Sequence, residues 1–196
     1  MLDIKKYFNN SSSTISNLFK FEKEINLIAN EIFLTQTNDK KLLVAGNGGS
    51  CSDAEHFTGE LQCTYKDRDR KPISAISLAT HPAALTAWSN DFGYNSYFQR
   101  QVEAHGKEGD ILFLISTGGG NEENGASMNL VYAAREAKKR NIKVISLLGK
   151  SGGILKELSN LSIIVESNTT SHIQEAHISI LHCICEILDY KKNEIK

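Results

Sequence analysis

The sequence predicts one α/β domain with three layers, in which a five-stranded parallel β-sheet lies between two layers of helices. Five short apolar runs alternate along the chain with stretches of helical character, as expected for parallel strands joined by helical crossovers. The apolar residues within each run are continuous rather than alternating, so both faces of the sheet are expected to be buried. A length of 196 residues with 40% hydrophobic content fits a single domain.

The first half of the chain supplies two of the expected strands. Apolar residues recur at spacings of three and four from Ile15 to Phe33, which predicts an amphipathic helix over about residues 14–36. A strand at 42–45 then stops at a glycine-rich turn and is followed by a helix over 53–65. A second strand at 75–78 precedes a helical stretch that continues through Trp88.

The second half repeats the same alternation three times. A strand at 111–115 is followed by a polar, glycine-rich loop and a helix over 127–140. Strands at 144–148 and 162–165 come next, and a long helix over about 173–191 ends the domain. No internal repeat or linker interrupts this order, so residues 1–196 are expected to form one domain.

Composition excludes several classes of function. The formal net charge is −1, and the basic run at 66–71 is expected to be a solvated loop, so a nucleic-acid-binding surface is not predicted. No apolar stretch is long enough for a membrane span or a secretion signal, which predicts a cytoplasmic protein with no membrane partner. The four cysteines are expected to stay thiols, with the last two packed inside a helix: Cys51, Cys63, Cys183 and Cys185.

Two expected strands end at loops whose composition suits an anion. Gly46, Gly48 and Gly49 allow the backbone to approach a ligand closely, and the following helix would direct free N–H groups at it, although a plain tight turn has the same composition. Residues 116–120 supply two hydroxyls and flexible amides, and Ser127 stands where the next helix begins. Loops at the carboxyl ends of parallel strands form ligand sites, so these two are candidate phosphate-binding loops.

Two better-known anion loops do not fit this sequence. The dinucleotide-binding fingerprint requires a third glycine where Cys51 stands. A nucleotide-binding P-loop ending at Lys150 and Ser151 would require a glycine in place of Val144, inside an expected strand. Dinucleotide binding and ATP hydrolysis are therefore disfavoured.

Ionisable side chains follow the first of these loops. His56 and Glu60 lie four residues apart, so one helix face presents both, either as a metal-chelating or general-base pair or as part of a solvated surface. The last helix carries Gln174 and His182, eight residues and about 12 Å apart on an ideal helix. Spacing alone does not make those two co-ligands, and histidines in so apolar a helix are more often core residues.

The segment 46–61, with the sequence GNGGSCSDAEHFTGEL, closely resembles the bacterial phosphoheptose isomerase family of sugar isomerase (SIS) domains. The similarity covers roughly residues 18–188. Supporting segments follow in the family's order at 90–94, 108–110, 115–117, 134–136, 148–150 and 173–177.

The resemblance implies a fold, an assembly and an activity. The fold would be a flavodoxin-like SIS domain, and the assembly a homotetramer with active sites near subunit interfaces, where the helices at 14–36 and 173–191 are expected to make contacts. The activity would be the zinc-dependent isomerisation of sedoheptulose 7-phosphate to D-glycero-D-manno-heptose 7-phosphate, which supplies heptose for lipopolysaccharide or capsule.

The resemblance also implies a role for particular residues. One zinc ion per subunit would be held by His56, Glu60, Gln174 and His182. Substrate contacts would be made by Asn47, Gly48, Gly49, Ser50, Glu60, Asn90, Asp91, Ser116, Thr117, Gly118, Ser127 and Gln174. Glu60 is expected to act as the catalytic base and His182 as its acid partner.

The chain departs from the family pattern at two places. The stretch 118–125 is several residues longer than the family's serine-rich loop, and Gly118 replaces a serine. Ser171 and His172 stand where the family has Asp-Arg, which removes a carboxylate beside the expected site. We therefore expect differences in phosphate geometry and in local pKa values.

Two other functions fit the same resemblance. A non-catalytic SIS tetramer would act through a protein partner such as a replication initiator, but the retained set of expected metal ligands argues against it. An isomerase or sensor for another sugar phosphate would keep the same phosphate-binding loops. Metal dependence and product analysis distinguish these functions from the isomerase.

Overall fold

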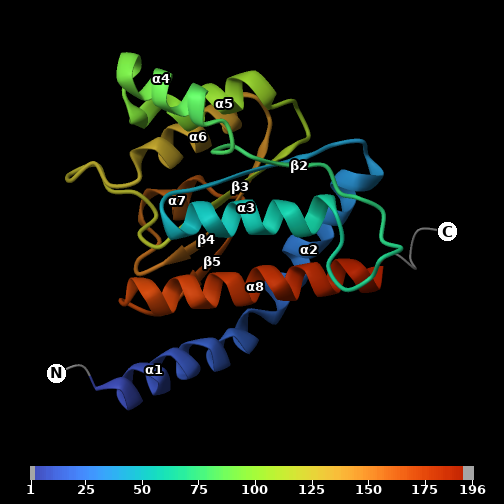
Figure 1. Cartoon of the computed structure of the whole chain (residues 1–196), viewed down its shortest axis with the longest axis vertical. Coiled ribbons are helices and arrows are strands. Elements are labelled where there is room, and N and C mark those ends of the chain that lie inside the picture. Colours follow the sequence, from blue (N-terminus) through green and yellow to red (C-terminus); the bar gives the residue numbers. More distant parts are fainter. Residues whose placement is uncertain (1–2, 192–196) are drawn as a thin grey trace.

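The computed structural model describes residues 3–191 and has the predicted three-layer architecture (Figure 1). One sheet of parallel strands has the order β2-β1-β3-β4-β5, which is the flavodoxin-like order. Its members are β1 (Leu42–Gly46), β2 (Ala75–Ser77), β3 (Ile111–Ser116), β4 (Lys143–Gly149) and β5 (Leu161–Val165). The predicted fold class is confirmed, and each expected strand lies within two residues of its predicted bounds.

Helices cover both faces of the sheet. One face packs against α2 (Glu22–Thr37), α3 (Gly49–Gln62) and α8 (Thr170–Lys191). The other packs against α4 (Pro82–Phe92), α5 (Tyr97–His105), α6 (Met128–Lys139) and α7 (Gly153–Leu158). Within β1, Leu42 and Val44 belong to the first core and Leu43 and Ala45 to the second. The strands are continuously apolar because successive side chains enter different hydrophobic cores.

The N-terminal helix expected at 14–36 is instead two helices. The helix α1 (Ile4–Ser16) is joined to α2 by a 3₁₀ turn, η1 (Asn17–Phe21), and lies along the outer side of α8 (Figure 1). Tyr7 donates a hydrogen bond to Glu175 of α8 at 2.9 Å, and Ser11 donates to the other oxygen of the same carboxylate. These tertiary hydrogen bonds order a polar segment in which apolar periodicity gave no helix signal.

Two short helices were not predicted. The helix α5 follows a 3₁₀ turn, η2 (Tyr94–Ser96), and buries Tyr97, Phe98 and Val102 against the second core. The helix α7 has six residues and buries Leu155. Both are too short to give a strong periodic pattern, so packing rather than local propensity determines them.

Two smaller expectations about side chains were wrong. The basic run at 66–71 is not simply solvated, because Arg70 is 6% exposed and its Nε donates to Asp189 Oδ1 at 2.8 Å. Cys185 is buried as expected, but Cys183 is exposed on the opposite side of α8. Among the described residues, no helix is long and apolar enough to span a bilayer.

Candidate active site

The candidate site lies where the chain changes direction across the sheet. The neighbouring strands β1 and β3 are parallel, and α3 after β1 covers one face while α6 after β3 covers the other. This arrangement separates the two connecting loops at the carboxyl ends of the strands, which is where parallel sheets of this kind bind ligands. Both loops predicted to bind phosphate lie at this edge of the sheet.

The first loop, residues 47–50, is shaped by close backbone packing. A side chain at Gly46 would overlap the backbone of Ser50, and Gly48 has φ +55°, a conformation that favours glycine. The helix α3 begins at Gly49, earlier than the predicted residue 53, so the free N–H groups of its first turn lie in this loop. Ser50 is buried in this turn, with 3% of its surface exposed.

The second loop runs from Ser116 to Ser127. Ser116 is buried at the end of β3, and its Oγ accepts a hydrogen bond from the Gly119 amide at 3.0 Å. Thr117 and Gly118 are half-buried beside it. Ser127 directly precedes α6 with φ +55°, and its hydroxyl does not cap that helix, so it can bond to a ligand.

The connection between β4 and α7 packs against this second loop at Gly152 and Gly153. A Cβ at Gly119, where φ is +71°, would overlap the carbonyl of Gly152 between β4 and α7. The Gly119 carbonyl accepts from the Leu155 amide at 2.8 Å, which ties the loop to α7. The glycine run at 118–120 is therefore needed for contact between two loop backbones as well as for any ligand.

The additional residues of this loop form a closed protrusion. The Asn121 amide donates to the Ala126 carbonyl at 3.0 Å, so the segment 121–126 begins and ends at nearly the same place. The Asn121 side chain accepts from the Glu123 amide at 2.8 Å, and Glu122 pairs with Arg135 of α6 at 2.8 Å. The extra length therefore projects outward, while Ser116 to Gly120 stay packed on α7.

Three of the expected metal ligands lie together beside α8. His56 Nε2 and Glu60 Oε1 are 3.1 Å apart, which confirms the contact predicted from their spacing. The ring of His182 lies 5.1 Å from the ring of His56, centroid to centroid, and stacks on Tyr65 at 5.8 Å. The helices α3 and α8 lie side by side (Figure 1). The contact between the His56 and His182 rings therefore joins the two helices.

Gln174, the fourth expected ligand, lies at the other end of this helix pair. A Cβ at Gly49 would come within 2.5 Å of Gln174 Nε2, so this side chain rests against the first loop. Gly49 precedes His56 by seven residues, about 10 Å along a helix. The helix α8 is continuous from Thr170, without the bend that would bring Gln174 toward His182. Within this chain Gln174 therefore contacts the first loop, and its expected roles toward the metal and the substrate stay predictions.

The donor chemistry of the cluster suits zinc. Two imidazoles and a carboxylate are a ligand set that zinc commonly takes, with a further position left for water or substrate. Between residues 3 and 191, no three His, Cys, Asp or Glu side chains are gathered tightly enough to hold an ion as they stand. His56 and Glu60 bond to each other instead, so ion binding requires that hydrogen bond to open.

Asn90 and Asp91 are exposed near the end of α4. The Asn90 amide donates to the Asp91 carboxylate at 2.8 Å. Within the described part of the chain, neither forms a hydrogen bond to the two loops. Their expected contact with substrate stays a prediction.

His172 lies outside the site. This imidazole is 5% exposed and packs edge-on against Tyr7 of α1, with ring centroids 4.8 Å apart. The departure from the family pattern at this position therefore serves the packing of α1.

Burial perturbs the pKa values of two groups near the cluster. Desolvation lowers the pKa of His177 to about 4, and the hydrogen bond between its Nε2 and the Leu148 carbonyl opposes this only in part. Burial raises the pKa of Asp53, and the nearby His56 partly offsets the effect. Asp53 Oδ2 is buried without a hydrogen-bond partner on the same helix as His56 and Glu60.

Sequence reasoning missed two residues of the first loop's surroundings. Asn129, 2% exposed on the first turn of α6, exchanges two side-chain hydrogen bonds with Asn47. The Tyr94 hydroxyl also donates to Asn47, at 2.8 Å. A buried asparagine at the start of an otherwise apolar helix was the available signal.

Comparisons with known proteins agree with this geometry. A SIS domain family model matches residues 6–149. Phosphoheptose isomerase of Helicobacter pylori strain P12 is 46% identical over 155 residues, which are 79% of this chain and 77% of the relative. Phosphoheptose isomerase of Campylobacter concisus is 39% identical over 186 residues, 95% of each chain.

A solved structure extends the match to three dimensions. The phosphoheptose isomerase of Neisseria gonorrhoeae superimposes with a TM-score of 0.86 at 32% identity, covering 95% of this chain and 97% of that one. Sequence, fold and the placement of the loops all lead to one family. The chain belongs to the phosphoheptose isomerase family of SIS-domain proteins.

Proposed function

We infer that this chain is a sugar-phosphate isomerase that converts sedoheptulose 7-phosphate to D-glycero-D-manno-heptose 7-phosphate for heptose biosynthesis. The observation that carries this function is the high identity to phosphoheptose isomerases over most of the chain. The geometry supports it, because the two candidate anion-binding loops follow neighbouring parallel strands and the His56–Glu60 pair follows the first of them. The alternatives of a protein-partner module or a sensor have no comparable support.

We propose that the second loop holds the substrate phosphate. Ser116, Thr117 and Ser127 offer hydroxyls, and α6 begins directly after Ser127 with its free amides at the same place. Such a site binds a phosphate monoester through neutral donors and a helix dipole, with no need for a lysine.

We assign proton transfer to Glu60 and His182. The reaction moves a proton between adjacent carbons through an enediolate, so it needs one base at carbon and one acid at oxygen. Glu60, as a carboxylate, takes the proton from C1 and returns it to C2. His182 gives a proton to the C2 oxygen and takes one from the C1 oxygen. His56 lies 3.1 Å from Glu60 and would share the metal ion with it.

Zinc is proposed as the cofactor because His56, Glu60 and His182 form a suitable donor set. When bound, zinc would polarise the substrate carbonyl as a Lewis acid. Gln174 is proposed to bind the sugar from its place against Gly49, together with Asn47, Gly48 and Ser50. The phosphorylated substrate and its enzyme are proposed to be cytoplasmic.

The substitution Glu60→Gln tests the function and the assignment of the base. We expect turnover to fall on the order of 10²–10⁴-fold, because the amide cannot accept a proton. The measurement is NMR of the conversion of sedoheptulose 7-phosphate by metal-depleted and zinc-reconstituted protein. Glu55→Gln, an exposed position on the same helix, is the control and should keep full activity.

Three results would contradict these assignments. Near-normal turnover by the Glu60→Gln variant would show that Glu60 is not the base. Full activity of the metal-depleted protein would show that zinc is not required. No conversion by the wild-type protein under any metal condition would overturn the isomerase function itself.

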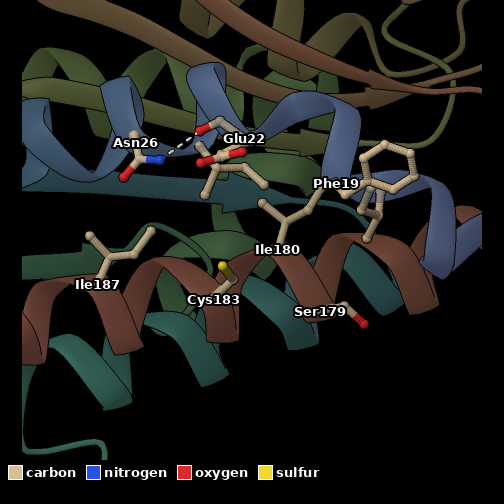
Figure 2. A pocket seen from close by; sticks show the side chains of 9 residues that line it. Phe19, Glu22, Asn26, Ser179, Ile180, Cys183 and Ile187 are labelled. Carbon is tan, nitrogen blue, oxygen red and sulfur yellow. Dashed lines mark hydrogen bonds between the residues drawn. The ribbon is translucent and has the colours of Figure 1, made fainter.

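We also propose a homotetramer. An apolar groove lies between α8 and the segment formed by η1 and α2, and Ile180, Cys183 and Ile187 line its α8 side (Figure 2). Phe19 stands at its edge with 77% of its surface exposed. Contiguous apolar surface on a soluble domain marks an interaction site. Subunit contacts through the N-terminal helices and α8 would cover this groove.

A further inference from the structure

Three chain segments meet at the side chain of Asn47. Asn47 follows β1, Tyr94 follows α4, and Asn129 lies on the first turn of α6. The two asparagine amides exchange hydrogen bonds of 3.0 Å and 2.8 Å, and the Tyr94 hydroxyl donates to Asn47 Oδ1 at 2.8 Å. Each of these three segments carries or adjoins residues that were expected to contact the substrate.

The backbone determines which way each amide points. The Leu130 N–H donates to Asn129 Oδ1 at 3.0 Å, so the oxygen of Asn129 must face it. With that oxygen in place, Asn129 Nδ2 faces Asn47 and requires the Asn47 oxygen opposite it. The orientation of Asn47 is thus set by a backbone amide of α6, through Asn129.

Counting the hydrogen bonds of Asn47 shows what remains for a ligand. Its Oδ1 accepts two hydrogen bonds, from Asn129 and from Tyr94, which occupy both lone pairs. Its Nδ2 carries two hydrogens, and one of them is donated to Asn129. Asn47 is left with one N–H donor and no acceptor.

We propose that Asn129 and Tyr94 are positioning residues that hold the Asn47 amide so that it offers the sugar phosphate a single N–H donor. The substrate group that this donor recognises is an oxygen with a free lone pair, such as a carbonyl, hydroxyl or phosphate oxygen. A reversed amide would present its own oxygen and repel the same group. This inference rests on the proposed function, because it assigns a role in that site.

The surroundings of Asn47, Asn129 and Tyr94 keep their hydrogen bonds in this one arrangement. Asn129 is 2% exposed, so water does not compete for its amide. Burial, followed by the nearby Cys51, raises the pKa of Tyr94, which keeps its hydroxyl protonated as the donor to Asn47. Tyr94 is itself 42% exposed, so it can be changed without opening the core.

Kinetics of two variants and their combination test the proposal. Tyr94→Phe removes one donor to Asn47, and the isosteric Asn129→Asp removes the other while keeping the acceptor for Leu130. Each should lower kcat/KM about tenfold, the usual effect of one hydrogen bond, mainly through a higher KM. Because both act on one amide, the double variant should lose little more than the worse single variant.

Matched controls separate positioning from general damage. Tyr190→Phe changes a tyrosine that is 72% exposed at the end of α8 and should leave KM and the melting temperature unchanged. If Asn129→Asp fails to fold, Tyr94→Phe alone still tests the positioning role, since it should raise KM without lowering the melting temperature. An unchanged KM for Tyr94→Phe, or a strictly multiplicative loss in the double variant, would overturn the proposal.

A second measurement does not depend on catalysis. In side-chain amide NMR of the ¹⁵N-labelled protein, one Asn47 Nδ2 hydrogen should exchange slowly with solvent and the other rapidly. Asn129→Ala, which removes the acceptor of the protected hydrogen, should remove this difference, whereas Tyr94→Phe, which leaves that acceptor in place, should keep it. Equal exchange of the two hydrogens in the wild-type protein would overturn the proposal. A split pattern in a protein that does not isomerise the heptose would instead overturn the proposed function and leave the network intact.

Discussion

His177 is a fully buried imidazole in the middle of α8, on the core side of the helix. Its Nε2 bonds to the Leu148 carbonyl at 3.0 Å, while Nδ1 is buried with no partner among the described residues. Protonation of the folded protein would place an unpaired charge in the core, and the pKa of about 4 reflects that cost. An unfolded histidine titrates near 6.5.

The stability of the protein should therefore depend on pH through His177. Between pH 6.5 and 4 the unfolded state binds more protons than the folded state. The stability that comes from keeping His177 neutral is therefore fully present above pH 6.5 and is lost as the pH falls toward 4. Between pH 7 and pH 5 the free energy of unfolding should fall about 2 kcal/mol more in the wild-type protein than in His177→Gln. Urea unfolding at the two pH values measures this difference.

The control for this prediction is the exposed His105. His105→Gln should keep the pH dependence of the wild-type protein, since an exposed imidazole gains little from folding. If His177→Gln and the wild-type protein lost stability equally on acidification, the neutral core imidazole would not be the cause.

Residue spacing predicted part of the candidate site and failed for another part. The contact between His56 and Glu60 follows directly from helix geometry, which places side chains four residues apart on one face. The approach of His182 depends on how α3 packs against α8, and no local pattern encodes that packing. Asn129 was missed because its role depends on Asn47, which lies far away in the sequence.

One buried ion pair joins the loop after α3 to α8. The side chains of Arg70 and Asp189 are 3% and 8% exposed, and the Arg70 guanidinium also donates to the carbonyls of Leu61 and Glu60. Asp189 Oδ2 accepts from the backbone amides of Lys66 and Asp67. A charge in the loop thus holds the end of α3, which carries Glu60, against α8.

Removing one partner of the Arg70–Asp189 ion pair should destabilise the protein strongly. Asp189→Ala leaves a buried guanidinium without its carboxylate, and we expect a loss of about 3–5 kcal/mol in the free energy of unfolding by urea. Glu186→Ala, one turn earlier on α8, removes an exposed pair with Lys66 and should change stability little. Equal effects of the two substitutions would contradict a special role for the buried pair.

The helices and strands with a clear apolar pattern were predictable from the sequence, and those without one were not. The strands and the long helix α8 were found because continuous or periodic apolar residues mark them. The helix α1 was missed because hydrogen bonds to Glu175, and not an apolar stripe, hold it in place. The short helix α7 depends on its contact with the glycine loop, which only the folded chain creates.

On the scale of the whole molecule, apolar surface remains uncovered along the N-terminal helices. Ile4, Phe8 and Phe19 are 66%, 65% and 77% exposed, and Phe19 borders the groove against α8. Burying one such side chain at a contact is worth about 1.5–3 kcal/mol, so Phe19 should matter to the proposed tetramer.

The substitution Phe19→Asp should weaken that assembly by at least about tenfold. Light scattering after size-exclusion chromatography should show a smaller species at micromolar concentration, whereas Phe19→Leu should keep the wild-type mass. A wild-type protein that is itself monomeric would contradict the proposed tetramer. An unchanged mass for Phe19→Asp would place the contact elsewhere.

The closed segment 121–126 has a practical consequence. Its ends meet at a hydrogen bond between Asn121 and Ala126, so its length can change without moving the strands or helices on either side. Protein engineers could therefore splice a foreign peptide or a fluorescent group into it as a cassette. Because Gly119 stays bonded to α7, such an insertion should leave the second loop and the fold of the enzyme unchanged.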